Sequence, residues 1–137
     1  CEYISKCKKT VYQDIALYYY RQDTVSITRS KFNLGKMTVL DAYSGIVKIL
    51  EEKGYREEIV NLQKVQYANQ MLSLLINIIE TDRKKYHKEF VMLRKLMREY
   101  KELYLKSDDI NKLHKIAFIC GIWSECLIVL LTKLKKR

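Results

Sequence analysis

The chain has 137 residues, of which 48% are hydrophobic, so one domain with a substantial apolar core is expected. Proline is absent and glycine occurs only four times, which argues against a loop-rich or β-sandwich design and favours long helices. The formal net charge of +10 comes from basic residues scattered along the chain. No RNA- or DNA-binding motif accompanies them, so we expect no nucleic-acid partner.

The cysteines at positions 1, 7, 120 and 126 form no Cys-x-x-Cys pair, and no histidine stands at a zinc-like spacing from them. We therefore expect reduced thiols in a cytoplasmic protein. In that case Cys120 and Cys126 pack as small hydrophobic side chains within their helix. The two histidines, His87 and His114, are isolated, and no metal site is expected from them.

Near the start of the chain, two short runs are rich in aromatic and β-branched residues, Val11-Tyr12 and residues 15–20. Gln13 and Asp14 separate them and suit a turn, because an Asp side chain can bond to the backbone two residues on. The pattern predicts a β-hairpin. A lone hairpin is only marginally stable, so this one must lean on helices or join a sheet outside the chain.

The residues Tyr18-Tyr19-Tyr20-Arg21-Gln22 begin a motif that continues with Ser26-Ile27 and with Leu40-Asp41 at a helix start. This arrangement resembles the segment that follows the catalytic core in bacterial family 2 glycosyltransferases, the nucleotide-sugar enzymes with a GT-A fold. The match covers roughly the first third of the chain. It departs from the family pattern at Ala16, where proline is common, and in a gap before Ser26 that is about one residue short.

The resemblance implies that Tyr20, Arg21, Ser26 and Arg29 bind substrate, either the sugar diphosphate or the acceptor. Arginine suits phosphate because its planar fork offers paired donors, and a serine hydroxyl adds one more. The alternative is that Arg21 and Arg29 are ordinary surface residues and that Ser26 caps a turn. The resemblance also implies a nucleotide-sugar donor and a cell-surface polysaccharide or lipid-linked glycan as acceptor.

In the resembled family an Asp-x-Asp motif binds the metal and the sugar diphosphate, and a later acid acts as base. This sequence has no Asp-x-Asp, so we expect an inactive C-terminal piece of a longer enzyme, with no catalytic residue, cofactor or metal of its own. The divalent metal belongs to the parent enzyme. Residues 1–35 are then the end of the core region, and residues 36–137 form a C-terminal helical domain.

Apolar residues recur at helical spacing from Lys36 onward, and Gly54 is typical of a helix stop. A second helix is predicted over residues 55–80. Asn69 interrupts its apolar stripe, and there are two interpretations: Asn69 lies at the edge of the stripe, or it is a buried residue that fixes helix register. The apolar faces are Leu40, Tyr43, Val47 and Leu50 in the first helix, and Leu62, Val65, Leu72, Leu75, Ile76 and Ile79 in the second.

Thr81-Asp82 predicts a capped break before a third helix that ends near residue 106. One stripe of this helix is aromatic and apolar, and the opposite face is basic. The stripe consists of Tyr86, Phe90, Leu93, Met97, Tyr100 and Tyr104. Ser107 followed by Asp108-Asp109 predicts an N-cap with acids in the first turn of the next helix.

The last predicted helix, residues 116–134, is apolar except for Ser124 and Glu125 up to Leu131, and basic residues follow. It is too short and too polar for a membrane span. Three interpretations remain open: a surrounded central helix, a helix exposed to a lipid surface with the basic C-terminus attracted to anionic head groups, or a homo-oligomer interface. The second would place the protein peripherally on the inner face of the plasma membrane.

Together these patterns predict a mainly α fold, a bundle of about four antiparallel helices with a short N-terminal β-hairpin or irregular segment. The helices would give the parent glycosyltransferase stability, assembly or membrane contact. The competing hypothesis is a non-catalytic helical protein-interaction module, in which the resemblance in the first third of the chain is coincidental.

Overall fold

The structure is a computed structural model that describes residues 9, 11 and 30–134. The chain divides into two compact units, Cys1–Lys31 and Phe32–Arg137. Of the predicted hairpin only Val11 lies among the described residues, so the hairpin stays a prediction, as does the domain boundary after residue 35.

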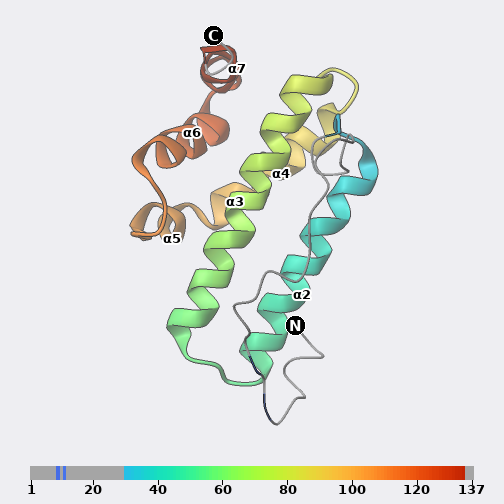
Figure 1. Cartoon of the computed structure of the whole chain (residues 1–137). Helices are drawn as coiled ribbons and strands as arrows, with labels where there is room; N and C mark the ends of the chain where they lie inside the picture. Colours follow the sequence, from blue (N-terminus) through green and yellow to red (C-terminus); the bar gives the residue numbers. More distant parts are fainter. Residues whose placement is uncertain (1–8, 10, 12–29, 135–137) are drawn as a thin grey trace. The chain divides into compact units, whose positions relative to one another are not determined.

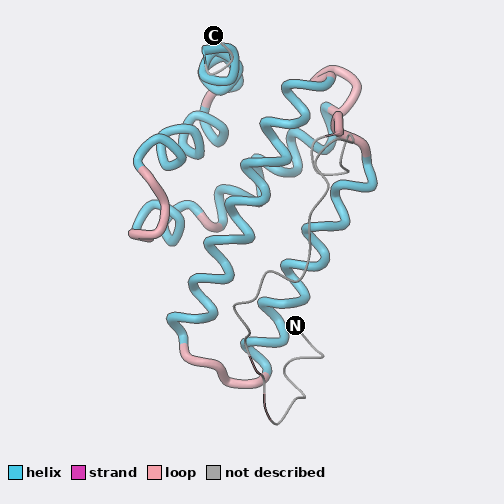
Figure 2. The backbone as a smooth tube through the Cα atoms, viewed as in Figure 1, coloured by secondary structure: helices cyan, strands magenta, loops and turns pink. Residues whose placement is uncertain are grey.

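The described part of the second unit consists of helices joined by short turns, and no β-strand occurs among the described residues (Figure 2). The mainly α fold class is confirmed. A short 3-10 helix precedes six α-helices, which are, in chain order, η1 (Leu34–Met37), α2 (Thr38–Glu52), α3 (Glu57–Thr81), α4 (His87–Glu99), α5 (Lys101–Lys106), α6 (Lys112–Trp123) and α7 (Glu125–Leu134) (Figure 1).

Helices α2 and α3 lie side by side and run in opposite directions (Figure 1). The predicted stop at Gly54 is confirmed, because this glycine has a φ of +66°, which favours residues without a Cβ. The N–H of Tyr55 donates to the carbonyl of Leu50 at 3.1 Å, and the N–H of Gly54 donates to that of Glu51 at 3.0 Å. These are the two bonds of a Schellman motif, and they reverse the chain within a few residues.

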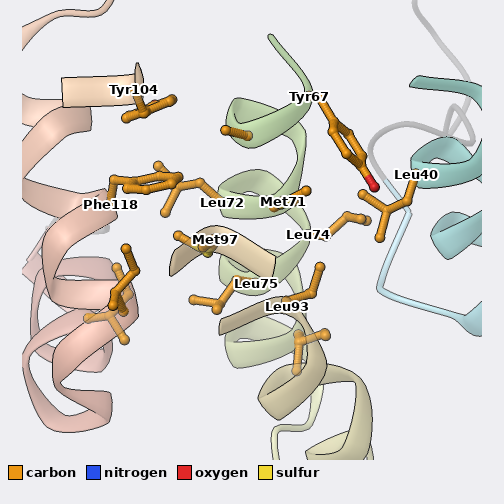
Figure 3. Close-up of a cluster of buried hydrophobic side chains, with 14 of the residues drawn as sticks. Leu40, Tyr67, Met71, Leu72, Leu74, Leu75, Leu93, Met97, Tyr104 and Phe118 are labelled. Atoms are coloured by element: carbon orange, nitrogen blue, oxygen red, sulfur yellow. The ribbon is translucent and has the colours of Figure 1, made fainter. Parts of the chain in front are cut away.

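Helix α3 is the centre of the unit. Figure 3 shows Leu72 on α3 facing Phe118 on one side, with Tyr67 and Leu74 facing Leu40 of α2 on the other. Because it is covered on both sides, α3 buries more residues than any other described helix. They are Val60, Val65, Tyr67, Ala68, Met71, Leu72, Leu74, Leu75 and Ile78.

The predicted face of α3 needs one correction. Val65, Leu72 and Leu75 are buried as expected, but the side chain of Leu62 is 46% exposed. Leu62 lies in the N-terminal half of α3, at the end of the helix that Figure 1 shows away from α6 and α7. Apolar spacing alone cannot show where along a helix its partners end.

The aromatic stripe predicted for the third helix is confirmed. Phe90, Leu93, Met97 and Tyr104 are fully buried, and Tyr86 and Tyr100 pack against the same core. The prediction of one continuous helix was wrong. The backbone leaves helical geometry at Tyr100, with φ −99° and ψ 3°, and this break divides the segment into α4 and α5. The break at Asp82 is present, and the Asp82 carboxylate accepts a hydrogen bond from the N–H of Lys85 at 3.0 Å within the turn, whereas α4 itself begins after Tyr86 without a side-chain cap.

The N-cap predicted at Ser107 is wrong. Ser107 ends α5, and α6 begins only after Asn111, whose side-chain oxygen accepts the N–H of His114 at 2.8 Å. Both Ser and Asn are strong caps, and buried Ile110, just before Asn111, anchors the turn against the core. Asp108 and Asp109 therefore lie in the turn between α5 and α6 rather than in a first helical turn.

The long apolar helix expected over residues 116–134 is also divided. Ser124 has extended backbone angles, φ −137° and ψ 115°, and its hydroxyl accepts the N–H of Leu127 at 3.3 Å at the start of α7. The segment is not the surrounded central helix of the bundle, because α3 holds that place (Figure 1).

The helical unit begins at Phe32, which is 3% exposed. Its N–H donates to the Thr81 hydroxyl at 2.8 Å, and its ring meets that of Tyr86 edge to face at 4.8 Å. The start of the unit is therefore fixed at the junction of α3 and α4.

Two leucines on α3 provide a test of this packing. We expect Leu75→Ala, at a fully buried site, to lower the free energy of unfolding by about 2–5 kcal/mol through lost burial and a cavity. Leu62→Ala, on the same helix and 46% exposed, should change it by about 0.5 kcal/mol or less. Urea unfolding followed by circular dichroism measures both, and equal losses would contradict the central position of α3.

Candidate functional site

The predicted substrate-binding residues Tyr20, Arg21, Ser26 and Arg29 all lie outside the described residues. Their roles stay predictions. Within the described part of the chain, no group of three or more His, Cys, Asp or Glu side chains is placed to hold a metal ion.

The densest polar cluster of the described residues is centred on Glu125 in the first turn of α7. Its carboxylate accepts Nη1 of Arg83 at 2.6 Å and Nη1 of Arg94 at 3.2 Å. Arg83 belongs to the turn between α3 and α4, and Arg94 lies on α4. Three elements that are distant in sequence are therefore held together by one carboxylate, and charge-assisted bonds of this kind are the stronger ones.

Arg94 also binds the end of α6. Its Nε donates to the Gly121 carbonyl at 2.9 Å, and its Nη2 donates to the Ile122 carbonyl at 2.7 Å. The last carbonyls of a helix have no partner within the helix, and a cation there also complements the helix dipole. One guanidinium therefore ends α6 and, through Glu125, fixes the start of α7.

Gly121 suits this corner because it brings α6 close to the core. A Cβ at this position would lie 3.3 Å from Cε of Met97 and 3.6 Å from Cδ2 of Leu75. The absence of a side chain lets the Gly121 carbonyl reach Arg94 while the helix packs on α3 and α4.

A shallow, open pocket of about 270 Å³ lies beside the cluster and is lined by Ile79, Arg83, Glu125, Cys126 and Val129. Its two charged side chains pair with each other, so the pocket wall is close to neutral. The geometry is that of a structural clamp, and its groups hold helices together rather than converge on a substrate.

Cys126 corrects one expectation. Its side chain is exposed, whereas Cys120 is half-buried against the core as predicted. Residues six positions apart lie on different faces of a helix, so the two cysteines need not share one environment.

The tyrosine Tyr104 supplies a second buried polar contact. Its hydroxyl donates to the Asn69 side-chain oxygen at 2.9 Å, and its ring stacks on Phe118 at a centroid distance of 4.0 Å. Asn69 therefore has a cross-helix partner, which links α3 to α5. The sequence showed both residues but no signal that pairs them.

Burial raises the pKa of Tyr104 from its ordinary value of 10.0 to about 12. Burial is also the main cause of the raised pKa of Tyr67 and of Tyr100, which contact each other edge to face at 5.4 Å. These hydroxyls stay protonated at neutral pH, so they act as hydrogen-bonding and packing groups.

The outer face of α6 is apolar. Ile116, Ile119 and Trp123 recur at three- and four-residue steps and are 50%, 37% and 66% exposed. Nζ of Lys101 on α5 lies 5.4 Å from the Trp123 ring centroid, a cation–π distance. Exposed leucines also occur on α7, at Leu127 and Leu130.

Comparison of the chain with protein-family models, with curated proteins and with solved structures finds no match in any of the three.

The clamp can be tested by removing its central arginine. Arg94→Gln should lower the free energy of unfolding by about 1.5–3 kcal/mol, because it breaks charge-assisted bonds and leaves half-buried carbonyls and Glu125 short of donors. Arg98→Gln, one turn later on α4 and exposed, should change it by about 0.5 kcal/mol or less. Similar losses in thermal and urea unfolding of the two variants would contradict the clamp.

The buried Tyr104 hydroxyl predicts a loss of stability in alkali. The folded state binds this proton more tightly than the unfolded state, so the stabilisation is complete below pH 10 and disappears as the pH rises toward about 12. Urea unfolding at several pH values should show this fall. Tyr104→Phe, which lacks the titrating group, should show a shallower fall, since Tyr67 and Tyr100 still contribute. Identical pH dependence in both proteins would contradict the assignment.

Proposed function

We propose that this chain is the C-terminal helical part of a family 2 glycosyltransferase that transfers a sugar from a nucleotide-sugar to a cell-surface polysaccharide or lipid-linked acceptor. The proposal rests on one observation, the motif Tyr18-Tyr19-Tyr20-Arg21-Gln22 followed by Ser26-Ile27 and a helical region. An Asp-x-Asp motif, a divalent metal and the catalytic base would be supplied by the parent enzyme, acting at the cytoplasmic face of the membrane.

The helical unit fits the supporting role in this proposal. Its first residue, Phe32, is buried and hydrogen-bonded to Thr81, so a segment that precedes it leaves from a fixed point. We propose that residues 11–20 form the hairpin, and that the helices serve as a four-part antiparallel bundle. In that bundle, α4 and α5 together count as one part. Helices α6 and α7 together count as another.

Within the parent enzyme, Arg21 is proposed to bind the donor diphosphate or the acceptor, with Tyr20, Ser26 and Arg29 beside it. A guanidinium contributes paired donors to phosphate oxygens. These residues would complete the binding site, while chemistry at the anomeric carbon would use the upstream acid and metal.

The experiment uses the parent protein, produced with the sequence that precedes this chain in its gene. Arg21→Ala should lower kcat/KM for the nucleotide-sugar by about 10- to 100-fold, the loss typical of a charge-assisted hydrogen bond. Arg98→Ala, an exposed arginine on α4, should leave turnover unchanged. The 137-residue chain alone should transfer no sugar. Transfer by the chain alone, or equal turnover in the two variants, would overturn the proposal.

The second candidate function is a non-catalytic interaction module, and the exposed apolar face of α6 favours it, since such surfaces commonly mark interaction sites. The sequence upstream of this chain distinguishes the two candidate functions. An Asp-x-Asp after a βαβ pattern supports the glycosyltransferase, and an upstream region without one supports the module.

A further inference from the structure

We infer that the outer face of α6, together with exposed leucines of α7, docks on an anionic membrane surface, with Trp123 as the inserted side chain. This inference does not depend on the proposed glycosyltransferase activity. The apolar docking set comprises Leu113, Ile116, Ile119 and Trp123 on α6 with Leu127 and Leu130 on α7, all exposed.

The pattern of α6 is the first argument. A surface helix ordinarily directs charged or polar residues to solvent, and a helix that is apolar all round is ordinarily buried. Helix α6 buries Phe118 and Ile122 against the core and still presents Ile116, Ile119 and Trp123 on the opposite side. Its apolar outer face therefore has no covering element among the described helices.

Charge indicates the kind of surface that covers it. Residues 112–137 contain six basic side chains and one acidic side chain, so this last part of the chain carries half of the net charge of +10. The acid is Glu125, which is already paired with Arg83 and Arg94. Apolar side chains bordered by lysines are typical of helices that lie in the interface of an anionic bilayer.

Lys112 and Lys115 lie on α6 itself, and Lys101 sits over the Trp123 ring at 5.4 Å. Lysine stems can lie along an apolar surface while their ammonium groups reach lipid phosphates. An indole prefers the same depth, because its ring is apolar and its N–H can bond to head groups. This arrangement places the proposed anchor, Trp123, beside the positive charge of Lys101.

The same charges disfavour a second copy as the occupant. A two-fold interface places the same surface of each copy against the other, so two surfaces that both carry Lys112 and Lys115 would be brought together. Like charges brought together in this way oppose association. No described helix is both long and apolar enough to cross a bilayer, so the contact proposed is one that lies on the surface.

Trp123 is the only tryptophan of the chain, so its fluorescence reports on the proposed contact without a label. The full 137-residue chain is titrated with vesicles of phosphatidylcholine alone or mixed with phosphatidylglycerol. We expect emission to shift to shorter wavelength only with the anionic vesicles, and acyl chains brominated near the head group to quench it. Co-sedimentation with the same vesicles measures the partition coefficient.

Two double variants locate the contact. Ile116→Gln with Trp123→Gln should weaken partitioning by about tenfold or more, because two apolar side chains no longer enter the interface. Ile59→Gln with Leu62→Gln on α3 is the matched control, since these residues are 36% and 46% exposed, and should bind as the unaltered chain does. Circular dichroism confirms that both variants keep their helices.

Three outcomes would overturn the inference. One is the absence of partitioning, or partitioning that the α6 substitutions do not change. Another is a concentration-dependent dimer in analytical ultracentrifugation that those substitutions abolish, which would assign the face to a second copy. The third is short-wavelength Trp123 emission without vesicles, which would mean that another segment of the chain covers the face.

Discussion

The helical unit depends on the requirement that α3 be covered on two opposite sides. Leu40 and Tyr43 of α2 meet one side, and Phe90 of α4 with Phe118 of α6 belong to the same continuous core. A helix of 25 residues with apolar side chains around much of its circumference cannot be stable at the surface. The arrangement of the other helices follows from that constraint, and the Schellman turn at Gly54 and the break at Asp82 let the chain fold back on α3 at both ends.

The corner between α6 and α7 shows a second constraint, that helix ends within a folded unit need partners. Arg94 binds the last carbonyls of α6, and Glu125 joins it to Arg83. The rotation of α6 has a different cause, because Phe118 and Ile122 are buried in the core and Ile116 and Trp123 lie on the opposite, exposed side.

The two proposals concern different parts of the chain and are compatible with each other. Residues 18–29 carry the resemblance to family 2 glycosyltransferases, while the docking face lies on α6 and α7. In the proposed enzyme, a peripheral helix that rests on anionic lipid would raise the concentration of the catalytic site near a membrane-bound acceptor. Either proposal can fail without the other, since membrane partitioning and sugar transfer are measured separately.

Local chemistry in the sequence determined the helical class, the stop at Gly54, the break at Asp82 and the buried stripe from Phe90 to Tyr104, because each depends on periodicity or on a few neighbouring residues. Only the tertiary structure decided that Asn111 rather than Ser107 begins α6, that the last apolar segment divides at Ser124, and that Tyr104 pairs with Asn69. Those features depend on contacts between residues about 30 positions apart, or on a choice between equally good local caps. The exposure of Trp123 is of the same kind, since an apolar residue carries no mark of whether a partner helix will cover it.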